Sequence, residues 1–173
     1  MVMTASDPKL YIVTGLPYSG KSTLARELVG RFGFGYASVD AEITAGGHDV
    51  TVMDQRDWDA VYTSAFDRLE SLLRSGRTTV FDGGSLKRHE RDSLRAVATT
   101  CGATPVLIYV DASPEEVRSR RRRNALTRER AHLADETMTT ALAMFEEPAA
   151  AEHPVRYHAT CDLDRWIETT IAE

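Results

Sequence analysis

The sequence predicts an α/β fold in which a five-stranded parallel sheet lies between two layers of helices. Two observations carry this prediction. Short apolar runs with the composition of buried strands alternate with helical patterns along the chain. No internal repeat and no linker interrupts the 173 residues. We therefore expect a single three-layer domain over residues 1–173.

The first strand and helix are predicted by adjacent patterns. Residues 10–14, LYIVT, are apolar and rich in β-branched and aromatic side chains, which is typical of a strand covered on both faces. Leu24, Leu28 and Phe32 recur at helical spacing. Residues 36–40, YASVD, predict a weaker second strand.

The middle of the chain holds an irregular segment and a strong helix. Residues 41–53 show no periodicity. Between residues 58 and 73, apolar side chains follow a 4-4-3-4 rhythm, which indicates an amphipathic helix that Gly76 ends. Residues 78–81, TTVF, predict the third strand, which ends at Asp82.

The second half continues the alternation. The predicted strands are 105–110 and 155–160. The predicted helices are 87–100, a helix that begins at the capping box Ser113–Glu116, 133–146 and 163–171.

Composition restricts the function. The chain is 42% hydrophobic and 27% charged, as in ordinary soluble globular proteins. A net charge of -5 argues against a broad nucleic-acid-binding surface and leaves room only for a small polyanion site. The N-terminal residues lack the pattern of a signal peptide, and no apolar run is long enough to span a bilayer, so we expect a cytoplasmic protein without membrane contact.

Polar side chains follow the predicted strands. The segment 15–22 follows the first strand, Asp40 ends the second, Asp82 the third and Asp111 the fourth. Parallel α/β sheets bind their ligands at the carboxyl ends of the strands. We therefore expect these groups to meet at one edge of the sheet.

The segment 15–23 carries the most specific motif. It fits GxxxxGK[ST] through Gly15, Gly20, Lys21 and Ser22. Backbone N–H groups of residues 16–20 and the N-terminus of the next helix are suited to hold phosphate oxygens. The expected nucleotide-binding residues are Gly15, Leu16, Pro17, Tyr18, Ser19, Gly20, Lys21, Ser22 and Thr23.

The same loop predicts a nucleoside triphosphate, ATP, together with Mg²⁺. Lys21 is suited to bridge the β- and γ-phosphates, and the Ser22 hydroxyl to bind the metal. Thr23 belongs to the first helical turn. No NKxD segment for reading guanine is present, and the chain is too short for a typical ATPase engine, so a small kinase remains.

Three segments resemble the small P-loop kinases of the polynucleotide-kinase, zeta-toxin and chloramphenicol-phosphotransferase type. They are IVTGLPYSGKSTLAREL, VFDGGSLKRHERDSLRAVA and VLIYVDASPEEVRSRRRRN, within residues 10–130. The resemblance implies the P-loop NTPase fold and phosphoryl transfer to a hydroxyl. It also implies that Asp40 accepts the proton of that hydroxyl, with Glu42 as the second candidate.

The third strand and the helix after it offer further candidates. Asp82 stands where an acid could hold Mg²⁺ or a magnesium-bound water, or it caps the next turn. Gly83, Gly84 and Ser85, which replace bulkier residues of the family pattern, are expected to leave room for the acceptor. In the resemblance an Asp at this place is followed nine residues later by an Arg, here Arg91, and either Arg88 or Arg91 could reach the site.

The arginine-rich lid that the resemblance implies covers about residues 118–132. Residues three apart share a helix face, which selects Arg120 and Arg123 as the arginines that contact the transferring phosphate, with Arg128 as a further candidate. The alternative is a solvated helix face.

The sequence thus predicts an ATP-dependent kinase for a hydroxyl of a small molecule, such as a metabolite, a nucleoside or an antibiotic. One alternative is a polynucleotide 5′-hydroxyl kinase. It is less favoured, because Ile43 and Thr44 stand where the resemblance expects an acceptor-holding arginine. The other alternative is a non-catalytic ATP-binding regulatory protein. The acceptor and the oligomeric state are not encoded in a readable motif.

Overall fold

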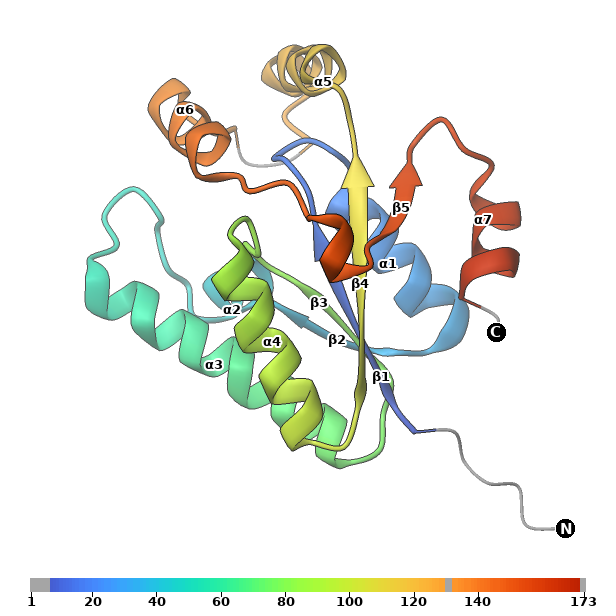
Figure 1. The fold of residues 1–173 in the computed structure, drawn as a ribbon. Helices are drawn as coiled ribbons and strands as arrows, with labels where there is room; N and C mark the ends of the chain where they lie inside the picture. The colour runs from blue at the N-terminus through green and yellow to red at the C-terminus, as the bar shows by residue number, and fades with distance from the viewer. Residues whose placement is uncertain (1–6, 130–131, 172–173) are drawn as a thin grey trace, which may run out of the picture.

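The computed structural model of the protein describes residues 7–129 and 132–171 (Figure 1). Five strands form one parallel sheet in the order β2-β3-β1-β4-β5. They are β1 (Lys9–Thr14), β2 (Gly35–Ser38), β3 (Thr79–Asp82), β4 (Thr104–Asp111) and β5 (Val155–His158). The predicted three-layer α/β fold is confirmed.

The described helices lie between and beyond these strands. They are α1 (Lys21–Phe32), α2 (Val39–Ala45), α3 (Gln55–Arg74), α4 (Arg88–Thr100), α5 (Pro114–Thr127), α6 (Asp135–Met144) and α7 (Leu163–Thr170), with a short 3₁₀ helix η1 (Ala150–Glu152). None of the described helices has the length and apolar character needed to cross a membrane.

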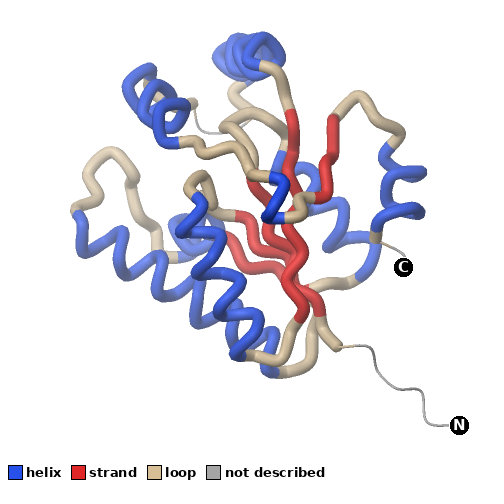
Figure 2. Tube along the Cα trace, viewed as in Figure 1, coloured by secondary structure: helices blue, strands red, loops and turns tan. Residues whose placement is uncertain are grey.

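Two cores cover the two faces of the sheet. Side chains alternate along β1, so Leu10 and Ile12 pack toward α3 and α4, whereas Tyr11 and Val13 pack toward α1 and α7. Figures 1 and 2 show these helix pairs on opposite sides of the sheet, with α5 and α6 beyond the carboxyl ends of the strands. The carboxyl-terminal end of the sheet therefore faces α5 and α6.

The prediction of an irregular segment over residues 41–53 was wrong for its first part, because α2 occupies residues 39–45. The second strand ends at Ser38, two residues earlier than predicted. The Ser38 hydroxyl accepts a hydrogen bond from the Ala41 backbone N–H at 3.3 Å and caps the new helix. Asp40 consequently lies in the first turn of a helix rather than at a strand end.

A buried ion pair joins α4 to the segment before β5. Arg91 is 0% exposed, and its Nε and Nη2 donate to the two carboxylate oxygens of Glu152, each at 2.8 Å. Its Nη1 donates to the carbonyls of Ser85, Leu86 and Glu146 at 3.1 to 3.2 Å. The sequence analysis considered Arg91 as a residue that could reach the site, but its side chain is buried elsewhere. Arg91 instead fixes the loop that follows β3.

We predict that this ion pair makes stability acid-sensitive. The bidentate bonds from Arg91 lower the pKa of Glu152 to about 2. A carboxyl whose pKa is lowered on folding contributes stability above its unfolded pKa, and that contribution is lost as the pH falls toward the folded value. The free energy of unfolding of the wild type should therefore decline between about pH 5 and pH 2.

The matched variants are Glu152→Gln and Glu70→Gln, measured by denaturant unfolding from pH 7 to pH 3. At pH 7, Glu152→Gln should cost about 3–5 kcal/mol, because it leaves the Arg91 guanidinium buried without a full counter-charge. Glu70 forms an exposed ion pair with Arg74, so its variant should cost about 0–1 kcal/mol. Two results would contradict the assignment. One is an equal loss in the free energy of unfolding for both variants. The other is a difference in that free energy between the wild type and Glu152→Gln that stays the same from pH 7 to pH 3.

Candidate active site

The loop between β1 and α1 has the backbone that the motif predicts. Gly15 adopts φ 149° and Gly20 φ 106°, conformations that side chains disfavour. A Cβ on Gly15 would lie 2.5 Å from the Val110 carbonyl oxygen, so only glycine fits there. The prediction that the backbone N–H groups of residues 16–20 hold phosphate oxygens needs one correction, because Pro17 has no N–H to donate.

Lys21 lies over this loop. Its Nζ donates to the carbonyl oxygens of Gly15 at 2.8 Å and Leu16 at 2.9 Å. The ammonium group is thereby held at the entrance of α1, where the helix N-terminus adds positive potential. Ser22 is half-buried in the first turn of the helix and Thr23 is exposed.

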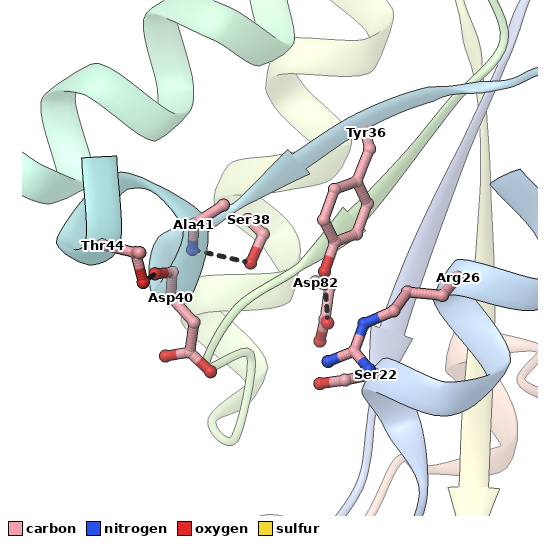
Figure 3. Close-up of a pocket in the computed structure, with 8 residues that line it drawn as sticks. All are labelled: Ser22, Arg26, Tyr36, Ser38, Asp40, Ala41, Thr44 and Asp82. Carbon is pink, nitrogen blue, oxygen red and sulfur yellow. Dashed lines mark hydrogen bonds between the residues drawn. The ribbon is translucent and has the colours of Figure 1, made fainter. Parts of the chain in front are cut away.

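A cavity of about 220 Å³ opens beside the loop (Figure 3). Residues from three chain segments meet in it: Ser22 from α1, Asp40 from α2, and Asp82 from the end of β3. Figure 3 shows Asp40 on one side, Ser22 on the other, and Asp82 between them. Three of the four polar groups predicted to meet at the strand ends therefore line this cavity. Asp111, at the end of β4, is not among its lining residues and pairs with Arg156 at 3.1 Å.

Asp82 is 6% exposed and is held by a tyrosine on the neighbouring strand. The Tyr36 hydroxyl donates to Asp82 Oδ2 at 2.9 Å. Burial and then the charge of Asp82 raise the pKa of Tyr36 to about 12, so the phenol stays a donor and Asp82 an acceptor. This bond joins β2 to β3, and Asp82 also lines the cavity.

The two candidate bases have different surroundings. Asp40 lines the cavity, whereas Glu42 accepts a hydrogen bond from the Ser64 hydroxyl of α3 at 2.7 Å. Glu42 is thus engaged with the next helix, and this geometry favours Asp40.

Arg26 is a cavity residue that the sequence analysis missed. It lies on α1 one turn after Ser22, and its guanidinium points into the cavity (Figure 3). Residues four apart on a helix share a face, so the spacing from Ser22 was the available signal.

Neighbouring side chains approach the glycines after Asp82 closely, although Gly83 and Ser85 also line a second cavity, described below. A Cβ on Gly83 would lie 2.5 Å from Val39 Cγ2, and one on Gly84 would lie 3.2 Å from the Tyr62 hydroxyl oxygen. Their small size lets α2 and α3 approach the loop closely. Thr14, the last residue before the nucleotide loop, donates its hydroxyl to the Ser85 carbonyl at 2.6 Å and joins the two loops.

The arginines of α5 have different partners. Arg120 Nη1 donates to the loop carbonyls of Tyr18 at 3.1 Å and Ser19 at 2.5 Å. Arg123 has a 73% exposed side chain and pairs with Glu129 at 3.5 Å. Arg120 contacts the nucleotide loop, whereas Arg123 points elsewhere in this structure. Arg128 is the C-cap of α5, and residues 130–131 of the predicted lid lie outside the described residues.

Tyr18 connects the nucleotide loop to α5, α6 and the segment between them. Its side chain is 5% exposed and packs with Val117 of α5 and Met138 of α6. Its hydroxyl accepts a hydrogen bond from the Leu133 backbone N–H at 3.1 Å. The sequence offered no signal for this role, because the position is variable in the motif.

Sheet order and nucleotide loop together define a P-loop protein. Residues 10–148 match the family described as an AAA domain, and the chain belongs to this family. The expected membership of the small P-loop kinases is thereby confirmed.

Two curated relatives are kinases, and one similar solved structure is a kinase as well. The chain is 31% identical to a shikimate kinase of Nitratidesulfovibrio vulgaris over 146 residues, which is 80% of this chain and 81% of the relative. It is 27% identical to a gluconokinase of Gluconobacter oxydans, over 95% of this chain and 90% of the relative. The structure of an APS kinase from Mycobacterium tuberculosis aligns with a TM-score of 0.67 at 18% identity, over 96% of each chain. These relatives support an ATP-dependent small-molecule kinase and leave the acceptor open.

We predict that Gly15→Ala weakens nucleotide binding. The added methyl group meets the Val110 carbonyl and forces an unfavourable φ, so the loop must change shape. The affinity for MgATP should fall at least tenfold, and the free energy of unfolding by about 1–2 kcal/mol or more. Titration calorimetry and denaturant unfolding measure the two effects.

Gly30→Ala is the matched control for this variant. Gly30 lies within α1, and a Cβ there meets nothing within 4 Å. This variant should bind MgATP normally and gain about 0.5–1 kcal/mol in helix stability. Unaltered MgATP binding by Gly15→Ala would refute the loop assignment.

Proposed function

We propose that the protein transfers the γ-phosphate of ATP to a hydroxyl of a small-molecule acceptor. The observation that carries the proposal is the single cavity that brings Ser22, Asp82 and Asp40 together beside the nucleotide loop. A kinase needs a triphosphate site, a metal site and an acceptor for the hydroxyl proton within one small volume.

The loop amides and Lys21 hold the phosphates in this proposal. Ser22 and Asp82 would hold Mg²⁺ directly or through water, since hydroxyl and carboxylate oxygens are its preferred ligands. Mg²⁺ would neutralise charge on the β- and γ-phosphates. Arg120, already at the loop, is placed to stabilise the charge of the transferring group. Arg123 stays a prediction, because it requires a movement of the lid.

Asp40 acts as the base in the proposed reaction. The acceptor oxygen forms a bond to the γ-phosphorus, the bond from that phosphorus to the β–γ bridging oxygen breaks, and ADP leaves. The hydroxyl proton passes to the Asp40 carboxylate, late in a loose transition state.

The test uses γ-labelled ATP with a panel of small hydroxylated compounds, nucleosides and 5′-hydroxyl oligonucleotides. Asp40→Asn should lower kcat by about 10²–10⁴ and leave the affinity for MgATP unchanged. Lys21→Met should weaken MgATP binding. Glu42→Gln, the matched carboxylate control, should retain activity.

Three outcomes count against the proposal. Undiminished transfer by Asp40→Asn would remove this residue from its role. Transfer to oligonucleotides alone would favour the polynucleotide 5′-hydroxyl kinase. ATP binding without transfer to any compound would favour the regulatory protein.

A further inference from the structure

A second cavity, of about 230 Å³, lies between α3 and α4 next to the loop that follows Asp82. Its polar lining consists of three hydroxyls, an imidazole and a carboxylate, from Tyr62, Ser85, Ser93, His89 and Glu90. Its apolar lining comes from Phe66, Phe81 and Leu94. Aromatic faces with a few convergent polar groups are typical of small-ligand sites, and this volume is below the range of about 300–1,000 Å³ for drug-sized ligands.

Tyr62 links this cavity to the loop that follows Asp82. Burial, followed by the charges of Glu90 and Asp40, raises the pKa of Tyr62. The Tyr62 hydroxyl oxygen lies beside Gly84 of the loop after β3. Tyr62 therefore joins the second cavity to the loop that follows Asp82, and Gly83 and Ser85 of that loop line the cavity as well.

The charge of the second cavity is negative. Glu90 is the charged side chain in its lining, and none of the described residues that line it is a lysine or an arginine. The nearby arginines of α4 have other partners: Arg91 is buried on Glu152, and Arg88 pairs with Asp92 at 3.5 Å. An anionic group placed here would lose water and meet a carboxylate without a counter-charge.

We infer that the acceptor is a compact polyhydroxylated molecule without a carboxylate, phosphate or sulfate group, and that its non-reacting end occupies this second cavity. The inference rests on the proposed function and specifies its substrate class. Hydroxyl groups of the acceptor match the side chains of Tyr62, Ser93 and His89, and an amine would be attracted by Glu90. Shikimate and gluconate, the acceptors in the names of the two relatives, both carry a carboxylate at neutral pH.

The experiment compares compounds of similar size that differ in charge. D-Glucose, D-glucosamine and D-gluconate form one series, and myo-inositol and shikimate form another. ADP release and the mass of the product give kcat/KM for each compound. The non-anionic members should exceed the acidic ones by at least about tenfold, as expected for an anion close to an uncompensated carboxylate.

Glu90→Gln tests the cavity itself. Glu90 Oε2 accepts a hydrogen bond from the Lys87 backbone N–H at 2.9 Å and caps α4. Glutamine retains this capping bond and removes the charge, so the fold should be preserved. The ratio of kcat/KM for the non-anionic compounds to kcat/KM for the acidic ones should fall about tenfold. Glu70→Gln, on the exposed side of α3, is the control and should leave the ratio unchanged.

The outcomes separate this inference from the proposed function. Preferred phosphorylation of gluconate or shikimate would overturn the inference and leave the kinase function intact. An unchanged preference in Glu90→Gln would overturn the assignment of the cavity. Binding of MgATP without transfer to any member of either series would count against both.

Discussion

The register of three parallel strands is the constraint on which the site depends. Asp82 at the end of β3 pairs with Val13 of β1 on one side and with Ser38 of β2 on the other. Because all three strands run in the same direction, the nucleotide loop after β1, the helix with Asp40 after β2 and Asp82 itself lie at one edge. A slip of one residue in β3 would move Asp82 to the opposite face of the sheet.

Buried polar contacts hold the loops at this edge in place. Thr14 is the last residue before the nucleotide loop, and its hydroxyl donates to the Ser85 carbonyl oxygen. The Arg91 guanidinium donates to the same oxygen. Ser85 has a positive φ of 55°, which a non-glycine residue retains only when its surroundings fix it. Tyr18 and Arg120 make the corresponding connection from the nucleotide loop to the lid helix. The loops of the site are thereby tied to the core and to each other.

Local patterns in the sequence were sufficient to predict the sheet and the nucleotide loop. The apolar run at 10–14 and the GxxxxGK[ST] motif each encode their structure within a few residues. The α2 helix was missed because its signal is one Ser38 cap in a segment without apolar periodicity. The roles of Arg91, Tyr18 and Gly83 depend on residues distant in the chain. Arg91 and Glu152, for example, are 61 positions apart, and no local pattern reports such contacts.

The central claim is that the triphosphate and its metal sit between Ser22, Asp82 and Asp40. Paramagnetic relaxation by Mn²⁺, bound with ATP in place of Mg²⁺, tests it most directly through the backbone amide signals of the labelled protein. The strongest broadening should fall on Ser22, Asp82 and Asp40 and the residues beside them, and it should require ATP. Broadening centred elsewhere, or broadening that is the same without nucleotide, would contradict the account.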